Sequence, residues 1–248
     1  MLAIIGGSGL GNIEGLEIIR REIVRTPYGQ PSEPLIFGNL GGKEVIFLAR
    51  HGANHTLAPH HINYRANIWA LQSVGVKSII SIASVGSIEN SIKVGDFVIP
   101  HQIIDYTYGR NNTFFDGLEN PVKHIDFTYP YDMSLREIII QSVQKLKYNF
   151  VSEGVYAATQ GPRLETAAEI DRYEKDGATI VGMTAMPEAV LARELNLSYV
   201  AICPVANHAA GRGESAEGIS SAMLNHSSEQ TIKNTIDILI HLVKTYGY

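Results

Sequence analysis

Residues 199–211 have the sequence YVAICPVANHAAG, and this stretch indicates how the chain folds. Tyr199–Ala206 is mostly apolar, which predicts a buried strand. Polar and small residues follow directly, beginning with Asn207. In open α/β sheets, ligands bind beyond the carboxyl ends of the strands. The segment therefore predicts a core strand that places Asn207 at the ligand-binding edge of a sheet.

Strands and helices alternate along the rest of the chain. The apolar patterns predict strands at 2–5, 35–37, 45–49, 78–83, 97–104, 151–158 and 179–181, and helices at 62–74, 134–146, 186–195 and 216–245, with a further helix opening at the capping box 166–169. Residues 105–130 show no clear period and predict a long loop of the kind that is often functional. We expect an α/β fold with a central parallel or mixed sheet flanked by helices, and we take residues 1–248 as a single domain.

The composition excludes several classes of protein. The 248 residues carry a formal net charge of −5 and no long basic run, so no nucleic-acid partner is expected. No apolar run approaches the roughly 18–20 residues of a membrane helix, and the short apolar start lacks the basic residues of a signal peptide. Cys203 is the single cysteine, which suits a reducing compartment. We therefore expect a cytoplasmic protein that does not contact a membrane.

Three segments at predicted strand ends offer hydrogen-bond donors to an anion. The glycine-rich turn Gly6–Gly11 carries the Ser8 hydroxyl and can bring backbone N–H groups close to a ligand, but it lacks the features of a P-loop. Arg50 and His51 follow the strand at 45–49, and an arginine fork suits phosphate. Ser84 follows the strand at 78–83. Taken singly, Gly6–Gly11 is also compatible with a turn that binds nothing, and turn chemistry or a side chain satisfied inside the protein is the more common explanation for Arg50, His51 and Ser84.

Contacts to a planar ring have candidates after three other strands. Glu165 can accept hydrogen bonds from a ring edge, although a helix dipole also favours an acid at its position without any ligand. Met183 and Thr184 follow the strand at 179–181, where core packing and helix capping are the alternatives. Asn207 can donate to a ring nitrogen, although asparagine is also common in turns.

Six motifs in one order resemble the trimeric nucleoside phosphorylase family, which includes purine nucleoside, methylthioadenosine and methylthioinosine phosphorylases. The motifs are IIGGSGL (4–10), ARHG (49–52), NYRANIWAL (63–71), GPRLETAAE (161–169), VGMTAMPEAVLARE (181–194) and VANHAAG (205–211). Each motif alone is weak, but the ordered set spans nearly the whole chain and is specific. The resemblance implies the nucleoside-phosphorylase fold and cleavage of a nucleoside by inorganic phosphate.

The resemblance also implies individual roles. It assigns phosphate contacts to Ser8, Arg50, His51 and Thr184, aided by the backbone around Ser84, and substrate contacts to Met183, Leu164 and Ala209. Adenine-using members usually carry threonine where Ala83 stands. Members are usually homotrimers with each site near a subunit interface, so a residue of the 105–130 loop is expected to come from a neighbouring subunit.

The chemistry of the base favours a 6-oxopurine. Hypoxanthine has a protonated N1 and an acceptor oxygen, whereas adenine has an unprotonated N1 and a donor amino group. Glu165 can accept from N1–H, and Asn207 can bond to N7 and O6. Adenine-specific members of the family place aspartates where Asn207 and Ala209 stand. We therefore expect Asn207 and Glu165 as the catalytic pair, stabilising negative charge on the leaving base.

The 5′ end of the substrate is less constrained by the sequence. Ile219, Met223 and Leu224 can form an apolar pocket for a methylthio group at the start of the last predicted helix, whereas His208 or His226 would suit a 5′-hydroxyl. The segments VGMTAMPEA and VANHAAG are most similar to methylthioinosine-using members. We expect conversion of S-methyl-5′-thioinosine and phosphate to hypoxanthine and 5-methylthioribose 1-phosphate. Inosine or guanosine phosphorolysis and methylthioadenosine phosphorolysis are the alternatives.

No metal or organic cofactor is expected, because the histidines lack metal-ligand spacing; inorganic phosphate is the co-substrate. Phosphate should attack C1′ opposite the base, with inversion. Three rival classes remain: a nucleosidase, a nicotinamide-dependent dehydrogenase and a non-catalytic nucleoside-binding protein. The phosphate set Ser8, Arg50 and Thr184 argues against the first and third, and Asn12, which breaks the dinucleotide fingerprint, argues against the second.

Overall fold

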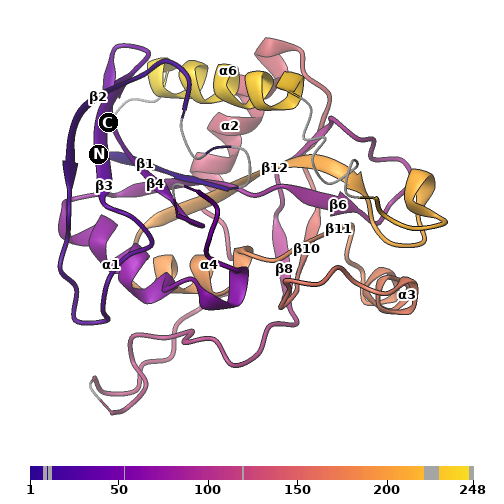
Figure 1. The fold of residues 1–248 in the computed structure, drawn as a ribbon, viewed down its shortest axis with the longest axis horizontal. Helices are drawn as coiled ribbons and strands as arrows, with labels where there is room; N and C mark the ends of the chain where they lie inside the picture. The colour runs from indigo at the N-terminus through magenta and orange to yellow at the C-terminus, as the bar shows by residue number, and fades with distance from the viewer. Residues whose placement is uncertain (8–9, 11–12, 53, 119, 221–228, 246–248) are drawn as a thin grey trace.

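A mixed sheet forms the centre of the molecule (Figure 1). The computed structural model describes residues 1–7, 10, 13–52, 54–118, 120–220 and 229–245. Within these residues the strand order is β2-β3-β4-β1-β5-β12-β6-β11-β10-β8, with β7 paired to β12 and β9 paired to β7. The strands are β1 (Leu2–Gly6), β2 (Leu16–Glu22), β3 (Leu35–Leu40), β4 (Lys43–Ala49), β5 (Ser78–Ile82), β6 (Val85–Ser87), β7 (Phe97–Val98), β8 (Gln102–Asp105), β9 (Phe150–Val151), β10 (Val155–Ala158), β11 (Ile180–Gly182) and β12 (Ser198–His208).

Helices cover both faces of this sheet. In Figure 1, α2 (Met133–Leu146) and α6 (Glu229–Thr245) lie together on one side, and α1 (Tyr64–Ser73) and α4 (Ala185–Glu194) lie together on the other. The remaining helix with a label, α3 (Ala167–Lys175), packs against β10 and β11 at the far end of the sheet. The short 3-10 helices η1 (Pro59–His61) and η2 (Gly213–Ser215) lie in connections. The expected α/β architecture with a flanked mixed sheet is confirmed.

Local sequence explains where the helices start. Asn63 and Asp132 accept hydrogen bonds from backbone N–H groups three residues on, at the N-termini of α1 and α2. Thr166 and Glu169 form the reciprocal capping box predicted for α3. Each cap satisfies N–H groups that the first turn leaves without a partner, so these helix starts follow from the sequence itself.

The central strand β12 joins the two halves of the sheet. It runs parallel to β5 on one side and to β6 on the other. Its pairing with β6 shifts register between Val205 and Asn207, and such a bulge re-aims the side chains that follow it. Helix α2 packs on one face of β12 and α4 on the other. The strand is thus the buried centre of the fold, and its irregular end lies where Asn207 is expected to act.

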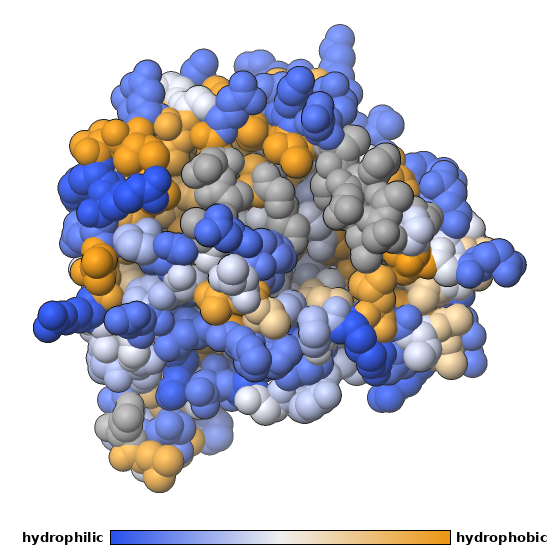
Figure 2. Space-filling model, viewed as in Figure 1, coloured by the Kyte–Doolittle hydropathy of each residue, from blue (hydrophilic) through white to orange (hydrophobic). Residues whose placement is uncertain are grey.

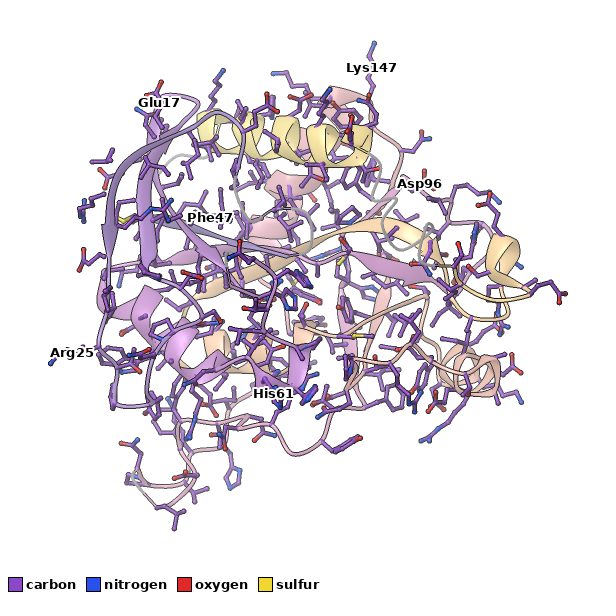
Figure 3. The ribbon with its side chains drawn as sticks, viewed as in Figure 1. Glu17, Arg25, Phe47, His61, Asp96 and Lys147 are labelled. Atoms are coloured by element: carbon purple, nitrogen blue, oxygen red, sulfur yellow. The ribbon has the colours of Figure 1, made fainter. Side chains whose placement is uncertain are left out.

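The core fills the space between the sheet and its helices. Figure 3 shows Phe47 inside this region, whereas Glu17, Arg25 and Lys147 point outward. Phe47 on β4 is fully buried, as expected for a strand covered on both faces. Within the described residues no helix combines the length and the apolar character needed to cross a bilayer.

Several predicted boundaries are wrong. The last helix was expected from residue 216, but η2 and a turn occupy 213–218, and α6 begins at Glu229. Gly218 has a positive φ of 133°, which a right-handed helix does not accommodate. Ile219 therefore lies outside any helix, and Met223, Leu224 and His226 lie outside the described residues.

The strand predictions also differ in detail. The expected strands at 97–104 and 151–158 are each divided, into β7 and β8 and into β9 and β10. Strand β2 was not predicted because its sequence, LEIIRRE, lies exposed on the edge of the sheet and carries no buried pattern. Strand β6 was not predicted because Val85–Ser87 is only three residues long and its small residues resemble a turn.

Candidate active site

A cavity of about 490 Å³ opens where several strands end. Its walls come from the residues directly after β1, β4, β5 and β11, from the end of β12, and from the turn before α3. This arrangement matches the rule that ligands bind beyond the carboxyl ends of strands in α/β folds. The cavity is lined by every predicted site residue that the structure describes, namely Arg50, His51, Ser84, Leu164, Glu165, Met183, Thr184, Asn207, Ala209 and Ile219. Ser8 and Met223 lie outside the described residues.

Arg50 lies at the bottom of the cavity and is fully buried. Its Nε donates to Glu188 Oε2 at 2.7 Å and its Nη2 donates to Glu188 Oε1 at 2.8 Å, while Nη2 also contacts Ser81 Oγ and Nη1 donates to the Ile82 carbonyl. The Arg50 guanidinium, which was expected to bind phosphate with two N–H groups side by side, thus binds the Glu188 carboxylate in that way. A guanidinium has five N–H groups, so one N–H of Nη1 remains without a partner among the described residues.

Glu188 is itself saturated with hydrogen bonds. Besides Arg50, its Oε1 accepts from Ser81 Oγ at 2.7 Å and from Tyr199 Oη at 2.8 Å. Because every partner is buried, the ion pair is protected from screening by solvent. Glu188 on α4 therefore fixes the position and plane of the arginine. Sequence reasoning did not single out this glutamate, and a buried acid within a helical stretch gives no periodic signal.

His51 lies beside Arg50 in a neutral state. Its Nδ1 lies 2.8 Å from the Leu57 carbonyl, to which only a protonated nitrogen can donate. Burial, with the nearby charge of Arg50, lowers the pKa of His51 to about 4. The imidazole stacks on His55 with ring centroids 4.3 Å apart. At neutral pH its Nε2 is therefore unprotonated and offers a lone pair rather than a second N–H.

Gly7 allows the chain to pass close to Arg50. A Cβ atom at this position would lie 2.5 Å from the Ile82 carbonyl oxygen and 3.2 Å from Arg50 Nη1, a separation that a side chain cannot adopt without displacement of backbone. A side chain at position 7 would therefore also crowd Arg50 Nη1, the nitrogen that carries the remaining N–H. Ser84 and Thr184 also line the cavity, so the expected phosphate contacts that the structure describes all face one cavity.

Glu165 lines the same cavity and is held by one hydroxyl. Thr159 Oγ1 donates to Glu165 Oε1 at 2.7 Å. Burial raises the pKa of Glu165, an effect that the hydrogen bond from Thr159 opposes. Among the described residues no side chain donates to the other carboxylate oxygen, Oε2, which can therefore accept a hydrogen bond from a ligand in the cavity.

Asn207 faces the same volume from the end of β12. Its Nδ2 donates to the neighbouring His208 carbonyl at 2.6 Å, and its side chain lies near Gly86. The carboxamide has two N–H groups and one oxygen, so one N–H and Oδ1 have no partner among the described residues. Glu165 and Asn207 therefore present an acceptor and a donor to a planar ligand.

Apolar residues form the remaining wall. Met183 is fixed against Gly161, which has a φ of 61° and where a Cβ would lie 2.5 Å from Met183 Sδ. Leu164, Ala209 and Ile219 also line the cavity. His208 is absent from the lining; its ring packs against Gly213. Of the two histidines considered for a 5′-hydroxyl, the one that the structure describes thus points elsewhere.

Arg110 fastens the loop at 105–130 to the cavity wall. It donates to the carbonyls of Met183 at 2.8 Å, Met186 at 2.6 Å and Gln160 at 2.8 Å. These carbonyls belong to the segments that carry Met183 and Glu165 into the cavity. The sequence marked this loop as functional, but nothing in its pattern distinguished Arg110 from a solvent-exposed arginine.

The segment 55–59 is a further wall that the sequence did not indicate. It continues from Arg50 and His51, and its only signal is that it follows a functional strand end. No group of three or more His, Cys, Asp or Glu side chains lies close enough to hold a metal ion within the part of the chain that the structure describes.

Known proteins show which family has this arrangement. The family model for the phosphorylase superfamily matches residues 1–244. The chain is 53% identical over 211 residues to a probable S-methyl-5′-thioinosine phosphorylase of Pseudomonas syringae pv. tomato, covering 85% of each chain. It is 47% identical over 231 residues to a 6-oxopurine nucleoside phosphorylase of Pyrococcus furiosus, covering 91% of this chain and 83% of that protein.

A solved structure agrees with these relatives. The methylthioadenosine phosphorylase of Schistosoma mansoni, in complex with adenine, superposes with a TM-score of 0.92 at 31% identity, over 98% of this chain and 90% of that one. The chain therefore belongs to the phosphorylase superfamily and is a phosphate-dependent pentosyltransferase of the nucleoside phosphorylase type.

Proposed function

We propose that the protein catalyses phosphorolysis of S-methyl-5′-thioinosine to hypoxanthine and 5-methylthioribose 1-phosphate. The observation that carries this proposal is the meeting of Arg50 and His51 with Glu165 and Asn207 in one cavity. The first pair suits an anion, and the second suits the edge of a 6-oxopurine. The printed names of similar proteins, including the one from Pseudomonas syringae pv. tomato, support the same substrate.

Phosphate binds, in this proposal, between the remaining N–H of Arg50 and the residues Ser84 and Thr184, with Ser8 as a further contact. The neutral His51 offers Nε2 to the proton of monohydrogen phosphate. Held in this way, phosphate lies ready to attack C1′ on the side opposite the base. Positioning of the nucleophile replaces a chance encounter in water, and inversion at C1′ follows.

The base leaves with negative charge spread over its ring. Asn207 donates to N7 or O6 and so stabilises the negative charge that develops in the transition state, while Glu165 accepts from N1–H and holds the base in position for that contact. Adenine has no proton on N1 and would place a bare nitrogen opposite the carboxylate. The pair therefore favours hypoxanthine as the leaving group. Met183 packs against the ribose and base, and Leu164 and Ala209 border the same ligand.

The 5′ group is assigned from the apolar end of the cavity. Ile219 supplies apolar surface for a methylthio group, and Met223 is proposed to join it. A specific observation favours the second candidate, phosphorolysis of inosine or guanosine: the Pyrococcus furiosus relative, at 47% identity, is named a 6-oxopurine nucleoside phosphorylase. The two candidates share the base and phosphate contacts and differ only at this end.

The proposal also includes properties of the whole protein. Residues 1–248 act as one nucleoside phosphorylase domain that needs no metal or organic cofactor and works in the cytoplasm. We propose a homotrimer in which the loop at 105–130 contacts a neighbour. Figure 2 shows hydrophobic atoms at the lower left, where this loop projects, and Tyr108, Leu118 and Val122 are 73%, 91% and 62% exposed. Exposed apolar surface of this kind commonly marks a protein contact. Light scattering coupled to size-exclusion chromatography measures the mass of the protein in solution, and a homotrimer should have three times the mass of one chain.

The decisive experiment measures free base released from four nucleosides: methylthioinosine, methylthioadenosine, inosine and adenosine. Each is incubated with and without phosphate. The proposal expects phosphate-dependent release that is fastest with methylthioinosine. Equal or faster release from inosine would support the second candidate and refute the 5′ assignment. Preference for methylthioadenosine would refute the roles of Glu165 and Asn207, and release without phosphate would indicate a nucleosidase.

A further inference from the structure

Thr159 lies beside Glu165 and is held in a fixed position. It directly follows β10, and its side chain and backbone together are only 5% exposed. Its N–H donates to the Gly182 carbonyl at 2.8 Å, and its own carbonyl accepts from Arg110 Nη2 at 3.2 Å. The backbone is therefore tied to β11 on one side and to the loop at 105–130 on the other, which leaves the hydroxyl little freedom to move.

The hydroxyl has two acceptors within reach. Thr159 Oγ1 lies 2.7 Å from Glu165 Oε1 and 3.3 Å from the Gly182 carbonyl oxygen. A hydroxyl carries one hydrogen, and a charged acceptor forms the shorter and stronger bond. The hydrogen therefore points to Glu165. Within the described part of the chain, no other side chain donates a hydrogen bond to this carboxylate.

We propose that Thr159 is the positioning residue that sets the base specificity of the site. Its hydroxyl holds Glu165 as an ionised acceptor and occupies Oε1, so that Oε2 is presented to the nucleobase. Such a carboxylate selects a base with an N–H at this edge, as in a 6-oxopurine, and rejects one with a bare ring nitrogen, as in a 6-aminopurine. This inference rests on the proposed function, because it assumes that Glu165 contacts the base.

The groups around Glu165 determine how much its ionised form depends on the Thr159 hydroxyl. Burial raises the pKa of Glu165, and the negative charge of Glu169 on α3 acts in the same direction. The backbone N–H of Glu165 and the charge of Arg163 act in the opposite direction, but the Arg163 guanidinium is exposed and bonded to both oxygens of Glu169. Tyr173 on α3 is the other titratable group beside the carboxylate, and its own pKa is raised by burial.

Loss of the hydroxyl would therefore change the chemistry of the carboxyl group. Without the bond from Thr159, the pKa of Glu165 rises further, and protonation extends to higher pH. A protonated carboxyl group donates a hydrogen bond and suits the unprotonated N1 of a 6-aminopurine. Loss of the Thr159 hydroxyl should thus lower the activity on a 6-oxopurine nucleoside and raise the relative activity on a 6-aminopurine nucleoside.

The test compares the native enzyme with T159V and T159S. T159V keeps the shape of the side chain but removes the hydroxyl, whereas T159S keeps the hydroxyl. The specificity ratio, kcat/KM for methylthioinosine divided by that for methylthioadenosine, is measured with saturating phosphate from about pH 5 to about pH 8. We expect T159V to lose about tenfold or more of this ratio, the usual effect of a lost hydrogen bond to a charged group. The pH at which the ratio falls should also move upward, and T159S should resemble the native enzyme.

The outcomes separate the inference from the proposed function. A native enzyme that does not prefer 6-oxopurines refutes the proposed function and the role of Thr159 with it. A native preference that T159V retains in size and in pH dependence refutes the role of Thr159 alone. If T159V does not fold, as judged from its thermal unfolding, T159A is measured in the same assay. A merely structural role would lower both kcat/KM values together and leave the pH dependence of their ratio unchanged.

Discussion

The residues proposed to bind phosphate, here called the phosphate end, and those proposed to bind the base, here called the base end, are held in place in different ways. At the phosphate end, four of the five N–H groups of Arg50 are used inside the protein, and Glu188 receives hydrogen bonds from Arg50, Ser81 and Tyr199. At the base end, Glu165 and Asn207 each make a single side-chain hydrogen bond to another residue and keep polar atoms for a ligand. The residues at the phosphate end are therefore part of the core, whereas those at the base end can be changed with little effect on the core. Changes should therefore affect stability at the first and substrate choice at the second.

The largest effect is expected from Glu188→Gln. This change leaves the Arg50 charge buried and uncompensated, which costs about 3–5 kcal/mol. Urea unfolding measures the loss. The matched control is the double variant Arg50→Met/Glu188→Leu, which removes both charges and should recover most of the stability without phosphate-dependent activity. A Glu188→Gln enzyme with unchanged stability would show that the ion pair between Arg50 and Glu188 does not stabilise the fold.

Glu165→Gln tests the base end. The free energy of unfolding should change little, because the carboxylate makes one side-chain bond. Loss of a charged acceptor should lower kcat/KM for a 6-oxopurine nucleoside by about 1.5–3 kcal/mol, or ten- to more than hundredfold. Adenosine or methylthioadenosine should lose less. Steady-state kinetics on both substrates, beside an unfolding curve, measure the difference; equal losses for both would contradict a role in base selection.

Arg110→Ala lies between the two ends and should affect both properties moderately. Removal of the guanidinium leaves the carbonyls of Met183, Met186 and Gln160 without this donor, at a cost of about 1–3 kcal/mol. KM for the nucleoside should rise because Met183 is displaced. Arg163→Ala is the matched control: its side chain is 68% exposed and bonds to Glu169 at the surface, so about 1 kcal/mol or less is expected.

The smallest effect is a pH dependence of stability that His51 should supply. Its pKa is lowered from 6.5 to about 4 in the folded protein, so between these values the unfolded chain binds the proton and the folded one does not. Stability from this group is therefore complete above about pH 6.5 and is lost as pH falls toward 4, by at most about 1.4 kcal/mol per pH unit. His51→Asn, which keeps a donor for the Leu57 carbonyl, should have a shallower slope in urea unfolding at two pH values. An unchanged slope would mean that folding does not lower the pKa of His51.

The sequence predicted the strand ends better than the contacts made there. Residues such as Arg50, Glu165 and Asn207 follow apolar runs, and the topology of an α/β sheet brings such positions to one edge. The arrangement of these residues around one cavity was therefore predictable. The partners Glu188 and Thr159 were not, because a buried polar pair depends on two elements that only the tertiary fold brings together.

Secondary structure, too, was predicted correctly only where the signal is local in the sequence. Helix starts with clear caps, such as Thr166 and Glu169, were predicted correctly because capping is local. The start of the last helix was placed at residue 216 instead of Glu229, since the apolar spacing near Ile219 continued the helical pattern. The positive φ of Gly218 ends that pattern, and apolar spacing does not reveal a backbone angle.

The position of β12 has a consequence for the order in which the enzyme forms during synthesis. Strands β5 and β6 are three residues apart in the chain, yet β12 lies between them and joins the two halves of the sheet. A ribosome that has made the first 190 residues has already synthesised Arg50, Glu165 and Met183, but not the strand that holds the halves together. A domain generally folds as a unit during synthesis. In this protein the catalytic cavity has to wait until residues 198–208 are inserted, so a nascent chain interrupted before them would be inactive even though it contains most of its site.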